Sequence, residues 1–376
     1  MGISAVCLLL GSSLSALAET IKVGAIFAVT GPASFLGGPA ARSAEMLVEQ
    51  INQAGGINGQ PIELIIKDSA GSSERAVSFA RQLIEEERVV AIVGPSTSGE
   101  SMAVKKIAED AKTVLISCAA AEVIVDPVAR YVFKTPQKDS FAAQKIFAEM
   151  QRLGIDTIAI AAGNDGFGKA GKEQLEKLAP TFDITVAASE TYDSKATDLS
   201  ALVAKLKANP SIGAVVNWSI VPAQAIIAKN MRQSGWDVPL FQSHGFGNIK
   251  YAEAAGVAAE GIIFPSGRLL VADALPEDDP QKAMLIQYKT EYEARYQEEA
   301  SAFGGYAYDA INIVVEALRQ AGNDRDGVRD AIEGLQGFAG IGGVFSFSPE
   351  DHNGLDIDSF VMLTVKDGTF TLYERQ

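Results

Sequence analysis

The sequence has few of the residues that bind metals or cross-link a chain. Its 376 residues include only two cysteines, Cys7 and Cys118, and only two histidines, His244 and His352. Zinc sites built from cysteine and histidine need more ligands than this, and a framework of several disulfides needs more cysteines. We therefore expect neither a metal ion nor a cofactor.

Basic residues are also in short supply. The chain has 32 lysines and arginines against 47 aspartates and glutamates, which gives a net charge of −15. Proteins that bind nucleic acids usually present a basic face, and anionic lipid attracts basic clusters, so the charge argues against both partners. The hydrophobic share of 47% allows a substantial core, and the length favours two domains.

Long apolar runs are confined to the first residues. Residues 3–18, ISAVCLLLGSSLSALA, carry no charge and end in the small-x-small pattern Ala16-Leu17-Ala18. This pattern predicts a secretory signal peptide that is cleaved after Ala18, although no lysine or arginine precedes the run. The run is too short and too rich in serine for a membrane-spanning helix. Cleavage leaves Cys118 as the remaining cysteine, and its apolar surroundings, VLISCAAA, indicate a packed, unreactive thiol.

Strand-like and helix-like segments alternate along most of the chain. Short apolar runs between turn residues predict strands, and apolar residues repeated every three to four positions predict helices. The expected strands are residues 20–28, 61–67, 89–93, 113–117, 157–162, 184–188, 212–217 and 240–242, and the expected helices are residues 39–54, 73–86, 100–110, 139–153, 169–178, 199–208 and 222–233. Such alternation forms parallel sheets that helices cover on both faces. Because the series restarts near residue 139, we predict an α/β fold with two doubly wound lobes.

The last third of the chain has a different pattern. Residues 282–296 and 303–320 are expected to form long helices. Two further strands, 360–365 and 369–373, flank the sequence Lys-Asp-Gly at 366–368, which is a hairpin signal.

One glycine-rich turn matches the pattern of a dinucleotide-binding loop. Residues 166–171, GFGKAG, follow a predicted strand, open a predicted helix and precede Glu190 by about 20 residues, as a Rossmann loop requires. The match is one short motif in mid-chain, and an exported protein meets little dinucleotide, so an NAD-dependent dehydrogenase is a remote alternative. A phosphate-binding P-loop is rejected, because Ala170 stands where a serine or threonine must bind magnesium.

A second turn, GPSTSG at residues 94–99, is close to the nucleophile elbow of serine hydrolases. Ser98 replaces the second glycine of that motif, and His244 is the base available in principle, so a hydrolase is a second remote alternative. A strand-to-helix turn explains the same residues, because free N–H groups and the helix dipole at such a turn suit a carboxylate. Ligands of open α/β sheets bind at the carboxyl ends of strands. We therefore expect the serine turn, Ser96, Thr97 and Ser98, to hold an anionic group.

Several segments, in order, resemble the leucine/isoleucine/valine-binding proteins, which are periplasmic substrate-binding components of ABC importers with the type I fold. The segments are IKVGAIFAVTGPASFLGGPA from residue 21, INQAGGINGQPIELIIKDSA from 51, IVGPSTSG from 92, VLISCAAA from 114 and AGNDGFGKAG from 162. The resemblance covers nearly the whole chain after the signal segment. It also gives the GFGKAG turn an ordinary explanation within this family.

The resemblance implies two lobes joined by a three-strand hinge, with a small ligand in the cleft between them. It places the chain crossings near residues 134–136, 264–267 and 340–343. The implied division is a signal peptide at 1–18, a first lobe of 19–135 plus 266–341, and a second lobe of 136–265 plus 342–376.

The resemblance also implies a set of ligand contacts from both lobes. These are Phe35, Leu36, Ser96, Thr97, Ser98, Ala119, Ala120, Ala121, Phe167, Trp218 and His244. Ala121 lacks the hydroxyl that the family usually keeps there. Phe167 matches an aromatic of the second lobe, and Trp218 is expected in the loop after the strand at 212–217.

His244 is the most informative departure from the family. In the amino-acid binders an acidic residue at this position pairs with the ammonium of the ligand. A neutral histidine suits a carboxylate, keto or hydroxyl oxygen instead. We therefore predict an exported solute-binding protein that captures a small organic carboxylate, with aromatic or α-keto acids favoured. The alternative ligand is a branched-chain or hydrophobic amino acid, its ammonium held by Asp165 or by carbonyl oxygens.

The resemblance further implies the partners and the location of the protein. We expect a periplasmic, monomeric protein that delivers its ligand to a membrane permease and its ATPase. A sensor domain that passes its signal to a partner protein uses the same binding chemistry, so a sensor role stays an alternative to transport. No catalytic residues are expected.

Overall fold

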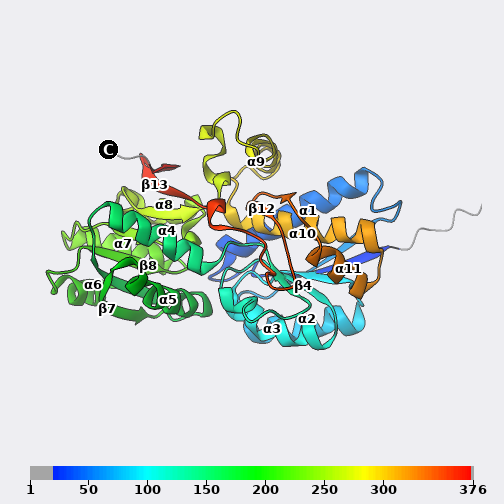
Figure 1. The fold of residues 1–376 in the computed structure, drawn as a ribbon, viewed down its shortest axis with the longest axis horizontal. Coiled ribbons are helices and arrows are strands. Elements are labelled where there is room, and N and C mark those ends of the chain that lie inside the picture. The colour runs from blue at the N-terminus through cyan, green and yellow to red at the C-terminus, as the bar shows by residue number, and fades with distance from the viewer. Residues whose placement is uncertain (1–19, 374–376) are drawn as a thin grey trace, which may run out of the picture.

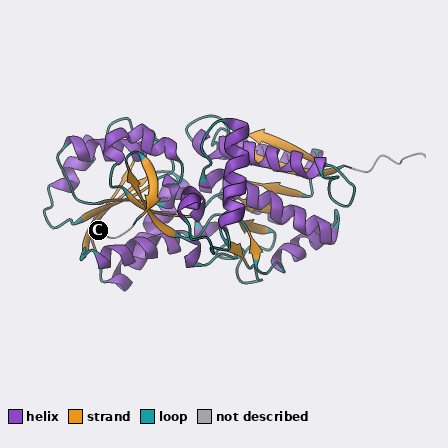
Figure 2. Cartoon of the chain, turned by 90° about the horizontal axis from the view of Figure 1, so that it is seen from above, coloured by secondary structure: helices purple, strands orange, loops and turns teal. Residues whose placement is uncertain are grey.

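The computed structural model describes residues 20–373. It shows two lobes side by side (Figure 1), each with a central sheet that helices cover on both faces (Figure 2). The predicted signal peptide at residues 1–18 lies outside the described residues. The two-lobed α/β fold is confirmed.

The first lobe contains a sheet of five parallel strands in the order β2-β1-β3-β4-β5. The strands are β1 (Ile21–Phe27), β2 (Ile62–Asp68), β3 (Ala91–Val93), β4 (Val114–Ser117) and β5 (Val132–Lys134). Its helices are α1 (Ser34–Gln53), α2 (Ser73–Arg81) with a π-helical turn at Gln82–Glu86, α3 (Ser98–Asp110), α9 (Lys282–Tyr296), α10 (Ala302–Ala321) and α11 (Arg325–Glu333). The central strands are buried on both faces, which explains their unbroken apolar runs.

The second lobe contains a mixed sheet of seven strands in the order β14-β13-β10-β9-β8-β6-β7. The strands are β6 (Thr157–Gly163), β7 (Thr185–Tyr192), β8 (Ala214–Trp218), β9 (Leu240–Gln242), β10 (Ile263–Ser266), β13 (Val361–Lys366) and β14 (Thr369–Leu372). Its helices are α4 (Asp139–Arg152), α5 (Gly166–Leu178), α6 (Ser200–Lys207), α7 (Ala223–Gln233) and α8 (Ile249–Ala255). β13 and β14 are antiparallel and form the predicted hairpin, so only the first-lobe sheet is purely parallel.

Helix α1 begins earlier than its sequence indicates. It starts at Ser34 rather than at residue 39, and Pro39 lies inside it. Because proline has no backbone N–H, it leaves the carbonyl of Phe35 without its helical partner. The side-chain amide of Asn248, from the second lobe, donates to that carbonyl at 2.9 Å. The helix therefore continues through the proline with help from the other lobe.

The segments that join the lobes are hydrogen-bonded to one another. The Asn353 amide donates to the Pro136 carbonyl at 2.8 Å, and the Gln137 amide donates to the Gly342 carbonyl at 2.7 Å. β11 (Phe338–Ala339) and β12 (Val344–Phe345) form a small separate ladder beside them. These bonds link the first crossing, after β5, to the third crossing, before β13.

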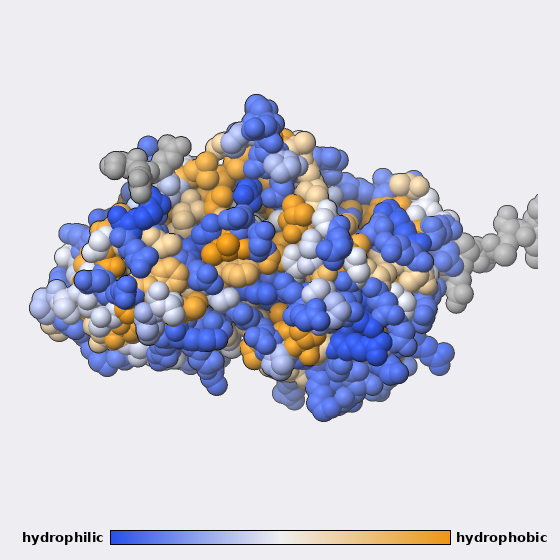
Figure 3. Space-filling view, in the orientation of Figure 1, coloured by the Kyte–Doolittle hydropathy of each residue, from blue (hydrophilic) through white to orange (hydrophobic). Residues whose placement is uncertain are grey.

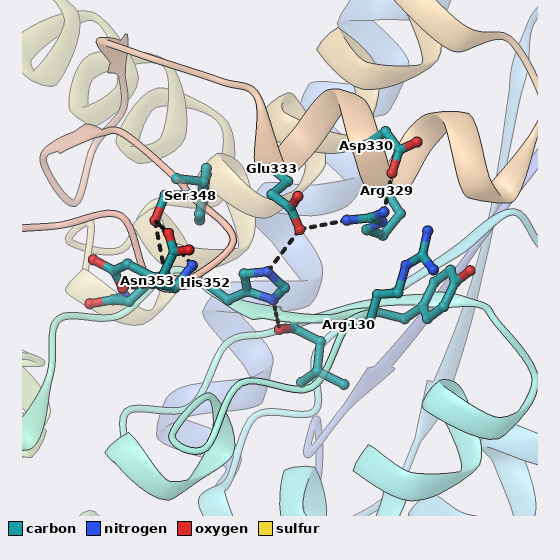
Figure 4. Close-up of polar contacts among 12 residues, drawn as sticks. Arg130, Arg329, Asp330, Glu333, Ser348, His352 and Asn353 are labelled. Atoms are coloured by element: carbon teal, nitrogen blue, oxygen red, sulfur yellow. Dashed lines mark hydrogen bonds and ion pairs between the residues drawn. The ribbon is translucent and has the colours of Figure 1, made fainter.

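His352 fastens the third crossing to the first lobe (Figure 4). Its ring stacks on the Phe133 ring, with centroids 4.1 Å apart. Nδ1 donates to the Val132 carbonyl at 2.9 Å, and Nε2 lies 3.3 Å from the Glu333 carboxylate. The predicted division of the chain into lobes, with boundaries after residues 135, 265 and 341, stays a proposal. The His352 contacts favour a third boundary after residue 352.

Candidate functional site

A small cavity lies where the two lobes meet. Its volume is about 20 Å³, which is room for about one water molecule. The first lobe and hinge supply Leu36, Ser96, Ser98, Cys118, Ala119, Ala120, Pro136, Phe303 and Tyr306, and the second lobe supplies Phe167, Ile220, His244 and Gly245. In this arrangement of the lobes the cavity is too small for an organic ligand, so we expect a ligand to enter when the lobes separate.

The structure brings most of the predicted contacts to this cavity. The predicted residues that line it are Leu36, Ser96, Ser98, Ala119, Ala120, Phe167 and His244. Sequence reasoning missed the other six lining residues, Cys118, Pro136, Ile220, Gly245, Phe303 and Tyr306. A single sequence does not show which distant loops meet. Ligand binding by the predicted residues stays a prediction.

Four of the predicted residues lie beside the cavity without lining it. Phe35 packs edge-on against Tyr251 of the second lobe, with ring centroids 5.3 Å apart. Thr97 caps α3, and its hydroxyl donates to Glu100 at 2.6 Å. Ala121 donates its N–H to the Ser98 hydroxyl oxygen at 3.3 Å.

Trp218, the fourth of these residues, is the last residue of β8 and not a loop residue. It is fully buried. Its indole faces α5, where a Cβ added to Gly171 would lie 2.0 Å from Nε1. Trp218 therefore packs against Phe167 and His244, and its ring centroid lies 5.7 Å from that of Phe167 and 5.6 Å from that of His244.

The GFGKAG turn is explained by close packing. A Cβ on Gly168 would lie 2.0 Å from the Gly163 carbonyl oxygen, and Gly171 faces Trp218 in the same way. Asp165 caps the helix by accepting hydrogen bonds from the N–H groups of Phe167 and Gly168. The glycines let α5 pack against β6 and β8, so no dinucleotide is needed to account for them.

The serine turn is held by side-chain contacts to backbone. The Ser96 hydroxyl accepts from the Ala28 N–H at 3.2 Å, and the Ser98 hydroxyl accepts from Ala121. Both side chains are buried, and each hydroxyl keeps its proton for donation. The first N–H groups of α3 have no partner within the helix, so the turn can offer several donors to one carboxylate.

His244 is the polar group that the second lobe presents to the cavity. Its ring is only 2% exposed and is surrounded by the edges of Phe167, Trp218 and Phe360, at centroid distances of 5.3, 5.6 and 5.4 Å. Neither ring nitrogen makes a hydrogen bond with any residue that the structure describes. Burial, and then the positive charge of Lys134, lowers the pKa of His244 to about 3. The imidazole is therefore neutral at physiological pH.

Two buried charged residues stand behind the cavity, and sequence reasoning missed both. Lys134, at the end of β5, is fully buried and donates to the carbonyls of Ala120, Pro136 and Gln137 at 2.9, 2.7 and 3.0 Å. Asp139, the first residue of α4, is also fully buried and lies 3.5 Å from His244 Nε2. Burial raises the pKa of Asp139 and lowers the pKa of Lys134, and the attraction between them opposes both shifts.

Ser96, Ser98 and His244 do not form the serine–histidine pair that a serine hydrolase needs. The Ser96 and Ser98 hydroxyls contact backbone amides, and His244 forms no hydrogen bond to either serine. Residues 20–373 contain no cluster of three or more potential metal ligands. Within the same range, no helix is long and apolar enough to cross a membrane.

Two lobes that meet around a small cavity, with serine hydroxyls on one side and apolar side chains on both, have the architecture of a solute-binding protein. Residues 20–369 match the family model described as periplasmic binding protein, and the chain belongs to this family. The chain is 28% identical over 326 residues to the leucine-, isoleucine-, valine-, threonine-, and alanine-binding protein of Pseudomonas aeruginosa, covering 85% of this chain and 84% of that protein. The family consists of substrate-binding transport proteins, not enzymes. Its members bind their ligands in the periplasm and work with ABC permeases in the membrane.

Solved structures give the same result. An extracellular ligand-binding receptor from Rhodopseudomonas palustris HaA2 superposes with a TM-score of 0.88 at 25% identity, over 94% of this chain and 99% of that one. The substrate-binding protein of a branched-chain amino acid transporter from Streptococcus pneumoniae, solved with isoleucine, gives 0.83 at 27% identity, over 94% and 98%. The predicted family and fold are confirmed.

Proposed function

We propose that this periplasmic protein captures a small organic carboxylate without an α-amine, such as an aromatic or α-keto acid, and delivers it to an ABC permease. The serine turn receives the carboxylate, and the apolar walls receive the side chain. The signal peptide directs export and is cleaved after Ala18, and the mature protein acts as a monomer. The observation that carries the proposal is a neutral, buried His244 where the resemblance implies an acidic residue in amino-acid binders.

The charge of the site supports this ligand class. A buried ammonium without a partner is strongly disfavoured, and the pKa of about 3 leaves His244 with no charge to offer. A neutral imidazole still has one N–H donor for a keto or hydroxyl oxygen. Phe167 and Leu36 add apolar surface from the two lobes.

A branched-chain amino acid is the second candidate. The relatives include proteins named for leucine, isoleucine and valine, and the Streptococcus pneumoniae structure contains isoleucine. The Asp139 carboxylate lies 3.5 Å from His244. When it accepts a hydrogen bond from the imidazole, the other ring nitrogen can accept one from a ligand ammonium. This observation favours an amine on the ligand.

Matched ligand pairs separate the two candidates. Phenylpyruvate and phenylalanine, or ketoisocaproate and leucine, differ in the amine at nearly constant shape. Isothermal titration calorimetry at neutral pH should show the keto acid binding about tenfold more tightly or better. Tighter binding of the amino acid in both pairs would replace the proposal with the second candidate.

A further inference from the structure

Asp139 and His244 form an isolated buried pair. The Asp139 carboxylate lies 3.5 Å from His244 Nε2, and both side chains are nearly or fully inaccessible. None of their four polar atoms makes a hydrogen bond to a described residue. Buried polar groups in folded proteins almost always have a hydrogen-bond partner. Asp139 and His244 can therefore bond to each other, and His244 can bond to a ligand.

The chemistry of a neutral imidazole links the two sides of this pair. One ring nitrogen carries a proton and donates, and the other accepts. If the Asp139 carboxylate is ionised, Nε2–H donates to it, and Nδ1 is left as an acceptor. If Asp139 is protonated, its O–H donates to Nε2, and Nδ1–H is left as a donor. The first state releases one proton to solvent relative to the second.

The surrounding charges leave Asp139 as the group that changes state. The Lys134 ammonium donates three hydrogen bonds to carbonyl oxygens, and a neutral amine has only two N–H groups for them. Glu122, Lys138 and Asp351 also act on the Lys134–Asp139 pair. The backbone N–H of Glu122 lowers the pKa of Asp139, although neither carboxylate oxygen has a hydrogen-bond partner among the described residues. Burial works in the opposite direction and holds the pKa of Asp139 well above its usual range.

We propose that Asp139 sets the tautomer of His244, and through it whether the cleft accepts a ligand oxygen or a ligand ammonium. Protonated Asp139 makes the site suit keto and hydroxyl acids, and ionised Asp139 makes it suit amino acids. Asp139 acts through His244 and is a positioning residue. The inference rests on the proposed function, because it needs a ligand that reaches His244.

The affinity ratio within a matched ligand pair tests this assignment. We expect the preference for ketoisocaproate over leucine to fall by about tenfold between about pH 5.5 and pH 8.5. In Asp139→Asn the ratio should no longer depend on pH, because the amide does not titrate. In the control Asp351→Asn, which changes a nearby acidic residue that does not contact His244, the ratio should keep its pH dependence.

The tautomer can also be observed directly in the unaltered protein. Only two histidines are present, so a ¹H–¹⁵N long-range correlation spectrum resolves both rings, and His352→Asn assigns them. We expect the His244 proton to move from Nδ1 to Nε2 as the pH rises. This measurement decides the question even if Asp139→Asn fails to fold.

The outcomes distinguish this inference from the proposed function. If ligands bind but the ratio and the His244 tautomer are the same at every pH, the inference is overturned while the proposed function stands. If Asp139→Asn keeps the pH dependence of the unaltered protein, the inference is overturned as well. If no carboxylate of either class binds at any pH, the proposed function itself fails.

Discussion

Asn248 donates a hydrogen bond across the cleft to the backbone carbonyl of Phe35, at 2.9 Å. The carbonyl is free because Pro39 cannot supply the helical N–H. Tyr251 packs on the Phe35 ring beside this bond, so the two lobes are joined here by both polar and aromatic contacts. Figure 3 shows hydrophobic side chains gathered toward the middle of the molecule, where the lobes meet, on an otherwise mainly hydrophilic face.

Asn248→Asp should weaken closure of the lobes. The carboxylate keeps the acceptor that caps α8 at the Lys250 N–H, but it turns the donor toward Phe35 into a second acceptor. Loss of one hydrogen bond and the added repulsion should lower ligand affinity about tenfold, as measured by calorimetry. Asn209→Asp adds the same charge on an exposed loop of this lobe and should leave affinity unchanged. Equal affinity in both variants would show that the bond does not help closure.

Gly166→Val should hold the lobes apart. Gly166, the first residue of α5, faces α3 of the first lobe so closely that an added Cβ would lie 2.8 Å from the Gly99 nitrogen. Small-angle scattering with saturating ligand should show a larger radius of gyration than the unaltered protein. Gly99→Ala is the matched control, because its Cβ would meet only the Ser73 hydroxyl, at 3.8 Å. A fully compact Gly166→Val complex would contradict this prediction.

Ser98→Ala tests the serine turn as the carboxylate site. A hydrogen bond to a charged group contributes about 1.5–3 kcal/mol, so affinity for a carboxylate ligand should fall roughly ten- to a hundredfold. The variant also removes the acceptor of the Ala121 N–H, so circular dichroism should first show that the fold is intact. Ser98→Pro removes the backbone donor and should reduce affinity further. Normal binding by both folded variants would place the carboxylate elsewhere.

His244 should make the protein less stable in acid. Its pKa is lowered from 6.5 to about 3 in the folded protein, so below pH 6.5 the unfolded chain binds a proton that the folded chain does not. The contribution of the neutral His244 to stability is therefore fully present above about pH 6.5 and is lost as the pH falls toward 3. The loss at pH 5 should be about 2 kcal/mol. Denaturant unfolding of His244→Gln at pH 7 and pH 5 should show a correspondingly smaller loss, and an unchanged loss would assign the effect to other groups.

Cys118 should report on lobe opening. Burial raises the pKa of this thiol to about 12, and the thiol lines the closed cavity. Because the thiolate is the reactive form, iodoacetamide at about pH 8 should label Cys118 slowly, and saturating ligand should slow labelling further. Mass spectrometry of the peptide that contains Cys118 gives the rate. Faster labelling with ligand present would contradict closure around this cavity.

Local sequence patterns predicted most elements, but not β5 and β10 at the crossings and not the helices α8 and α11. The helix expected at residues 282–296 is α9 with the same bounds, since its ends and periodicity are local features. β5 and β10 have only three and four residues and carry almost no periodicity of their own, although the equally short β9 was predicted with its bounds. α1 was placed too late because Pro39 usually marks a helix start, and the partner that makes it an interior residue comes from the other lobe.

Local sequence was enough to infer the two α/β series, the serine turn at the end of a buried strand, and the unusual His244. These depend on neighbours within a few positions and on the resemblance carried by those segments. The burial of Lys134 and Asp139, and the 3.5 Å distance from Asp139 to His244, could not be inferred in this way and are seen in the folded chain. In the sequence, KTPQKD at residues 134–139 has the polar composition of a solvated loop. Burial of a charge depends on which distant segments fold over it, and here those segments come from both lobes.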